Sequence, residues 1–228
     1  MVSTVTQSPF KNASIRLASR SNFVIFPIDQ RDFFEGLRGI GFTVAREPPR
    51  GVPFGITATI GGNVARIDGM VLDMDIDRQV IGLQGPSMEL VIEKFGQVEK
   101  LLNDRFGLNL AQNIRFYEII ASFQLETGKV PVDTLGKLPG FEQVVKSFGS
   151  VMGRAVVPFA LRVRLSDSLP NDEEWFEMTI EPLVINPKLR YYVTTIFRSP
   201  ERNKVLGFAR ELQIKIPDVV KSLESMST

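Results

Sequence analysis

Three aspartates at alternating positions are the residues whose types and spacing come closest to a chemical site. Asp73, Asp75 and Asp77 are separated by Met74 and Ile76. Because the side chains of a strand alternate between its faces, we expect the three carboxylates to share one face. Carboxylates about 7 Å apart could hold Mg²⁺ or Ca²⁺, so one alternative is a metal-dependent hydrolase. The interpretation that we favour is the solvated outer face of a half-buried antiparallel sheet.

Charged residues with the same alternation occur in two later segments. Arg162 and Arg164 alternate with apolar neighbours, and Glu177 and Glu181 alternate in the next predicted strand. These four residues are the candidates for binding through a sheet face. Cross-strand Arg–Glu pairs on an exposed sheet contribute only ~0.2–1 kcal/mol each. A further hypothesis is a homodimer in which the two arginines meet the acidic strand of a second copy.

A third group of charges lies around a predicted helix start. Arg198, Arg202 and Lys204 flank Pro200, and the N–H groups of a helix N-terminus favour anions. This group predicts anion binding, and nucleic-acid binding through the region Arg198–Arg210 is the third candidate function. The chain carries 27 Lys and Arg against 26 Asp and Glu, a net charge of +1. Proteins that bind polyanions usually show a basic excess, so we do not expect nucleic acid as the partner.

Cysteine and histidine are both absent from the 228 residues. Their absence excludes Ser-His-Asp and Cys-His catalysis, thiolate zinc sites and iron–sulfur clusters. No phosphate-binding glycine motif occurs, so we expect no cofactor. We favour a non-enzymatic binding or assembly protein whose partner is a small ligand or another protein. No apolar run reaches about 18 residues and the N-terminus lacks the apolar core of a secretory signal, so we expect a cytoplasmic protein without a membrane segment.

The elements that must position these residues follow from periodicity and from Gly and Pro. Two adjacent prolines predict a loop at 47–53, and the Gly-rich residues 61–69 are predicted to be a loop between two strands. The rest of the first half is predicted to form extended segments at 14–27 and 42–46, a helix at 29–39, strands at 54–60, 70–76 and 79–84, and a helix at 88–106.

The second half is predicted to follow the same order. Its strands are expected at 114–125, 159–165, 175–180 and 190–197, with a loop at 128–138. A helix at 139–152 carries apolar Phe141, Val144, Val145 and Phe148. The last helix is predicted to run from Pro200 to Leu212, to be interrupted by Pro217 and to resume briefly up to Leu223.

Matching local sequence accompanies this repeated order. Leu72-Asp-Met-Asp-Ile-Asp77 is similar to Phe176-Glu-Met-Thr-Ile-Glu181, and Pro86 and Pro200 each open the final helix of a half. We therefore predict an α+β fold built from a duplicated β-α-β-β-β-α unit, with a mostly antiparallel sheet and helices on one face. The predicted organisation is a flexible lead (1–13), a first repeat (14–108) and a second repeat (109–228), fused into one compact domain.

This arrangement also predicts which side chains face the helices. They are Leu72, Met74, Ile76, Phe176, Met178 and Ile180. The element order resembles the saddle of TATA-binding proteins and the gyrase-inhibitor-like binders of small ligands, although no motif diagnostic of either family occurs. The carboxylates of the open face would repel DNA phosphates, which argues against a DNA saddle.

Overall fold

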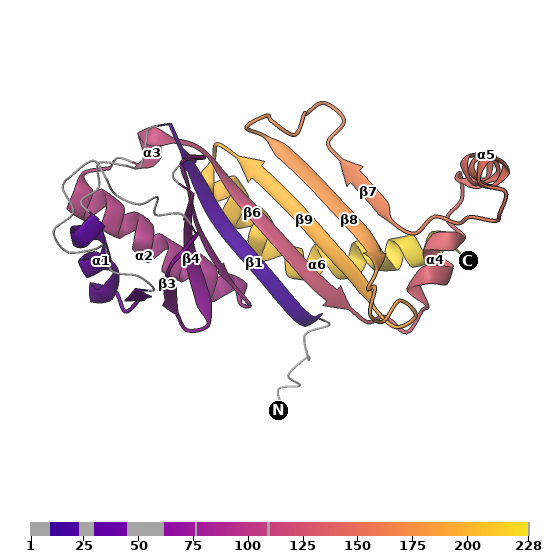
Figure 1. Cartoon of the computed structure of the whole chain (residues 1–228), viewed down its shortest axis with the longest axis horizontal. Helices are drawn as coiled ribbons and strands as arrows, with labels where there is room; N and C mark the ends of the chain where they lie inside the picture. The colour runs from indigo at the N-terminus through magenta and orange to yellow at the C-terminus, as the bar shows by residue number, and fades with distance from the viewer. Residues whose placement is uncertain (1–9, 23–29, 45–61, 76, 109, 228) are drawn as a thin grey trace, which may run out of the picture.

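The described part of this protein is built around a nine-stranded antiparallel sheet (Figure 1). The computed structural model describes all residues except 1–9, 23–29, 45–61, 76, 109 and 228. Among the described residues the strand order is β2-β3-β4-β5-β1-β6-β9-β8-β7, and every neighbouring pair is antiparallel. The strands are β1 (Phe10–Ser21), β2 (Thr43–Val44), β3 (Gly62–Ile67), β4 (Met70–Asp75), β5 (Val80–Gly85), β6 (Ile114–Leu125), β7 (Leu161–Arg164), β8 (Trp175–Pro182) and β9 (Tyr191–Ser199).

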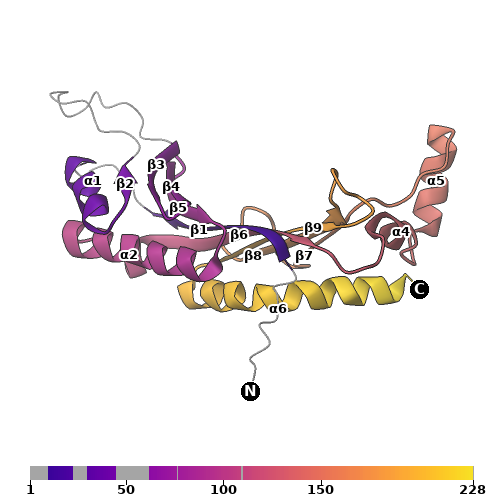
Figure 2. The same cartoon turned by 90° about the horizontal axis from the view of Figure 1, so that it is seen from below.

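Two long helices, α2 and α6, cover one face of the sheet (Figure 2). We call the opposite face the outer face. The helices are α1 (Gln30–Gly39), α2 (Met88–Phe106), α3 (Leu110–Asn113), α4 (Pro131–Gly136), α5 (Glu142–Met152) and α6 (Arg202–Met226). The predicted mixed α+β class with an antiparallel sheet is therefore confirmed.

The centre of the sheet is the pair β1 and β6. These 12-residue strands run side by side from Phe10 opposite Leu125 to Ser21 opposite Ile114. Their pairing places the other first-half strands on one side and the other second-half strands on the other. Alternate side chains such as Leu17 and Ile119 are buried beneath the helices, as expected for a sheet with one covered face.

Helix α2 has the bounds that the sequence predicts. The Ser87 side chain accepts a hydrogen bond from the backbone N–H of Leu90, which satisfies one free donor of the first turn. At the other end Gly107 adopts a left-handed conformation (φ 62°), which a residue without a Cβ adopts at no steric cost. Between these caps, Val91, Phe95 and Val98 are fully buried.

The predicted facing of β4 and β8 is confirmed for the residues that the structure describes. The side chains of Leu72, Met74, Met178 and Ile180 are buried. Phe176 is only half-buried, but its ring lies edge-on to Phe208 of α6, with 5.9 Å between the ring centroids. Ile76 and the predicted strand at 54–60 lie outside the described residues.

The predicted loop at 61–69 is wrong, because residues 62–67 form strand β3. A two-residue turn, Asp68-Gly69, joins β3 to β4. Both turn residues have positive φ (48° and 76°), which is the backbone of a type I′ hairpin turn. Asp-Gly is a preferred sequence for that turn, so the turn itself was readable from the sequence, but the neighbouring glycines obscured the strand.

Two further predictions are corrected in the second half of the chain. Helix α6 continues through Pro217 instead of ending before it. Proline in a helix interior costs roughly 3 kcal/mol; here Ile216 and Val220 on either side are fully buried, and their burial offsets that cost. The predicted loop at 128–138 contains helix α4, which begins with Pro131 at a position that needs no N–H donor and buries Leu135.

Candidate functional site

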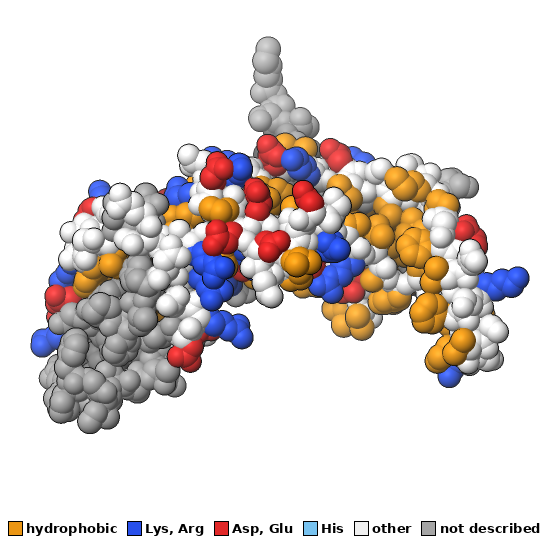
Figure 3. Space-filling model, turned by 90° about the horizontal axis from the view of Figure 1, so that it is seen from above, with side chains coloured by type: hydrophobic (Ala, Val, Ile, Leu, Met, Phe, Trp, Pro, Cys, Tyr) orange, Lys and Arg blue, Asp and Glu red, His pale blue; other side chains and the backbone are white. Residues whose placement is uncertain are grey.

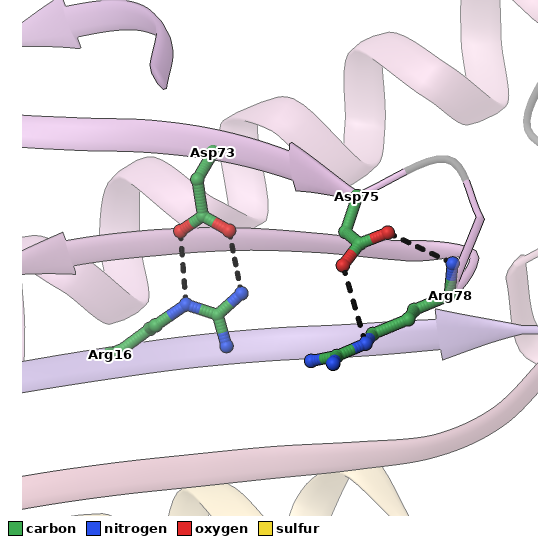
Figure 4. Close-up of polar contacts among 4 residues, drawn as sticks. All are labelled: Arg16, Asp73, Asp75 and Arg78. Carbon is green, nitrogen blue, oxygen red and sulfur yellow. Dashed lines mark hydrogen bonds and ion pairs between the residues drawn. The ribbon is translucent and has the colours of Figure 1, made fainter. Parts of the chain in front are cut away.

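The first aspartate of the acidic strand is bound by an arginine (Figure 4). Arg16 of β1 donates two hydrogen bonds to Asp73 of β4, from Nε to Oδ2 (2.9 Å) and from Nη2 to Oδ1 (2.6 Å). Strand β5 lies between them, and the guanidinium passes over Gly82, where a Cβ would lie 2.5 Å from Nη2. Burial lowers the pKa of Arg16, but Asp73, Glu118 and Asp75 outweigh this effect and raise it.

The other two aspartates do not join Asp73 in one site. Asp75 accepts a hydrogen bond from the backbone N–H of Arg78 (2.9 Å) and forms an ion pair with its side chain (Nε–Oδ2, 3.6 Å). Asp77 lies in the turn after β4 and is exposed. No group of three His, Cys, Asp or Glu side chains that could hold a metal occurs in the described part of the chain. The three carboxylates would share one face only in a strand that continued to residue 77, whereas β4 ends at Asp75.

The guanidinium of Arg198 binds both a carboxylate of the outer face and the backbone of a loop. Nε and Nη2 donate to the Glu118 carboxylate (2.9 and 2.5 Å), and Nη1 donates to the carbonyl oxygens of Pro170 and Asp172 (2.9 and 3.0 Å). Its guanidinium carbon lies 4.5 Å from the centroid of the Phe116 ring. Each of these contacts is internal, so this arginine acts in the structure as an anchor for residues 165–174.

Arg202 and Lys204 are also paired with carboxylates, but with different ones from Arg198. Arg202 donates from Nε and Nη2 to Glu99 of α2 (2.9 and 2.6 Å), which ties the start of α6 to α2. Burial and the neighbouring Glu99 raise the pKa of Tyr117 beside this pair. Lys204 lies 2.7 Å from Glu201. The structure therefore does not bring the three predicted anion-binding residues to one site.

The predicted sheet-face residues do share the outer face, and two of them form an ion pair there. Arg162 forms an ion pair with Glu177 (2.7 Å). Arg164 donates to the backbone oxygens of residues 165 and 168 (2.8 and 2.9 Å), and Glu181 lies opposite Tyr192 of β9. Arg162, Asp73 and Asp75 thus form ion pairs within one chain, whereas Arg164 makes hydrogen bonds to backbone oxygens.

An apolar surface that the sequence did not single out lies on α5 and the segment after it. Figure 2 shows α5 standing away from the sheet, at the end of the molecule opposite α1. Figure 3 shows hydrophobic side chains gathered on this projecting end. We call residues 141–159 the apolar arm. Its exposed large apolar side chains are Phe141, Val144, Phe148, Val151, Met152, Val157 and Phe159.

The contrast between α1 and α5 defines the arm as a distinct surface. Both helices are short, with 10 and 11 residues, and both are amphipathic. Helix α1 buries Phe33, Phe34 and Leu37 against α2 and β2. Helix α5 buries no residue, and Val151 is 83% exposed. The sequence predicted the apolar stripe of α5 correctly, but no local signal shows whether such a stripe is covered.

Comparison with known proteins adds no family to this description. A scan against protein-family models finds no match, and comparisons with curated proteins and with solved structures find no significant similarity. Within the described residues, none of the helices has the length and apolar character needed to cross a membrane.

Proposed function

We propose that this chain is a non-enzymatic binding or assembly protein, and that it binds a protein partner through the apolar arm. One observation carries the proposal: α5 has the apolar stripe of a packed helix but buries none of its residues. A helix of 11 residues is marginal in water without a packing surface. Contiguous exposed apolar surface on a globular protein usually marks an interaction site. A partner surface that covers α5 accounts for both features.

The chemistry of the outer face supports binding over the other candidate functions. A hydrolase built on Asp73, Asp75 and Asp77 needs three convergent carboxylates, whereas the first two bind arginines and the third lies in a turn. Nucleic-acid binding needs cations that are free to neutralise phosphates. Arg198 and Arg202 are held by Glu118 and Glu99 instead.

A duplicated β-α-β-β-β-α unit remains our proposal for the origin of the scaffold, and the strand registers support it. Strands β5 and β9 end at Gly85 and Ser199, which are 114 positions apart, and α2 and α6 begin at Met88 and Arg202, also 114 apart. Leu72 pairs with Leu83 and Phe176 with Phe197, which keeps the predicted match of residue 72 with residue 176. In this comparison α5 corresponds to α1, but unlike α1 it buries none of its residues.

Site-specific photo-cross-linking tests the proposed function. A benzoylphenylalanine is placed at position 151 on the exposed stripe, or at position 150 on the opposite side of α5 as the matched control, in the full chain inside cells. We expect intermolecular protein cross-links from position 151 and far fewer from position 150. Cross-links from position 151 that stay within the same chain, or equal yields from both positions, would show that the arm is not a protein-binding surface.

A further inference from the structure

The occupant of the arm can be inferred from the pattern of the α5 stripe, which we define as Val144, Val145, Phe148, Val151 and Met152. These residues lie three or four positions apart and therefore on one side of the helix. The stripe is symmetric about Phe148, with pairs of aliphatic residues three and four positions before it and after it. A two-fold axis at Phe148 would place Val144 against Met152 and Val145 against Val151 of an identical, antiparallel helix.

The charges at the two ends of α5 favour the same arrangement. Glu142 lies in the first turn of α5, and Arg154 follows the C-terminal cap. In an antiparallel pair, the acidic end of one helix lies level with the basic end of the other, and the helix dipoles oppose each other. A parallel pair would bring like charges and like dipole ends together.

The exposed apolar area of the arm is about three-quarters of what each partner buries in a standard interface. Val151 is 83% exposed, Val157 67%, Phe148 60% and Met152 56%. Together with the three other exposed apolar side chains of the arm, this is equivalent to about four fully exposed residues, on the order of 600 Å². A standard interface buries ~800 Å² on each partner, so the arm supplies most of that area.

We propose that the apolar arm binds a second copy of this chain, with α5 packed antiparallel against α5 of the partner about a two-fold axis at Phe148. The inference rests on the proposed function, because it names the partner for the same surface. It replaces the charge-paired dimer, because Arg162, Asp73 and Asp75 already form ion pairs within one chain. An isologous contact of this kind closes at two copies and gives no filament.

Sedimentation of the full chain tests whether the arm makes the dimer. At tens of micromolar we expect the wild type to sediment as a dimer and Val151→Lys as a monomer, with the dissociation constant raised at least 100-fold. The matched control Ser150→Lys places the same charge on the polar side and should remain dimeric. Because Val151 is exposed, Val151→Lys should leave the thermal midpoint of the monomer unchanged. A monomeric wild type, or a dimer that survives Val151→Lys, overturns the proposal.

Disulfide trapping tests the antiparallel register, and the absence of cysteine from the chain makes single substitutions clean. In the proposed pair the two Val144 residues are separated by eight residues of rise, about 12 Å, beyond the ~7 Å Cα separation that a disulfide spans. We therefore expect no cross-link in Val144→Cys alone, but a cross-linked heterodimer when Val144→Cys and Met152→Cys chains are mixed. Cross-linking of Val144→Cys with itself overturns the antiparallel arrangement.

The two proposals fail in different ways. If position 151 cross-links to a different protein while the purified chain is monomeric, the proposed function stands and the self-association inference is wrong. If position 151 forms no intermolecular cross-link and the chain is monomeric, both are wrong.

Discussion

The contact between Arg16 and Gly82 gives the sharpest quantitative prediction for the outer face. The guanidinium reaches Asp73 only by lying on strand β5, at a point where the strand has no side chain (Figure 4). A Cβ at residue 82 would lie 2.5 Å from Nη2 and 2.7 Å from Cζ of Arg16. Real Cβ atoms essentially never approach non-bonded atoms this closely, so Gly82→Ala must lift the guanidinium away from Asp73.

The size of the effect follows from the geometry of the pair. Both side chains are about one-fifth exposed, and hydrogen bonds to charged groups contribute ~1.5–3 kcal/mol. Alanine within a strand is favoured over glycine by ~0.5–1 kcal/mol through backbone entropy. Gly82→Ala should therefore destabilise the wild type by about 1–2 kcal/mol. In an Arg16→Ala background, where the guanidinium is gone, the same substitution should stabilise by ~0.5 kcal/mol or more.

A double-mutant cycle measured by urea unfolding separates this contact from other effects. We expect a coupling free energy of about 1.5–3 kcal/mol between positions 16 and 82, with unchanged m-values. Gly207→Ala on α6 is the control, because no atom lies within 4 Å of its new Cβ. Its effect on the free energy of unfolding should be the same with Arg16 and with Arg16→Ala. A coupling below ~0.5 kcal/mol would refute the view that Gly82 exists to let Arg16 cross the strand.

Three further predictions test the core, a buried tyrosine and the acidic strand. Leu72→Ala should cost ~3–5 kcal/mol in chemical unfolding and Phe176→Ala only ~2–3, because Leu72 is fully buried and Phe176 is half-buried; the reverse order would contradict this difference in burial. Burial raises the pKa of Tyr191 to about 12, above its unfolded value near 10, so the contribution of its neutral form is complete below pH 10 and is lost between pH 10 and 12. That loss should be at most about 2.7 kcal/mol and should shrink in Tyr191→Phe. Millimolar Mg²⁺ or Ca²⁺ should not shift the thermal midpoint, and a shift that Asp75→Asn removes would restore the metal-site interpretation.

Three ion pairs of this protein could not be predicted from the sequence, because their partners lie far apart in the chain. Arg16 and Asp73 are 57 residues apart, Glu118 and Arg198 are 80 apart, and the Glu99–Arg202 pair spans 103. Neither partner carries a local pattern that points to the other. The charged residues were therefore recognised as outer-face groups, but their neutralisation followed only from the strand order.

Elements with local signals were predictable from the sequence. The bounds of α2 and β6 followed from apolar periodicity and caps, and strand alternation placed Leu72 and Met178 beneath the helices. The continuation of α6 through Pro217 and the exposure of α5 depend on long-range packing, which no local pattern encodes. Periodicity states which side of a helix is apolar, but what covers that side depends on residues far away in the chain or in another molecule. For that reason the same kind of stripe is core in α1 and an open surface in α5.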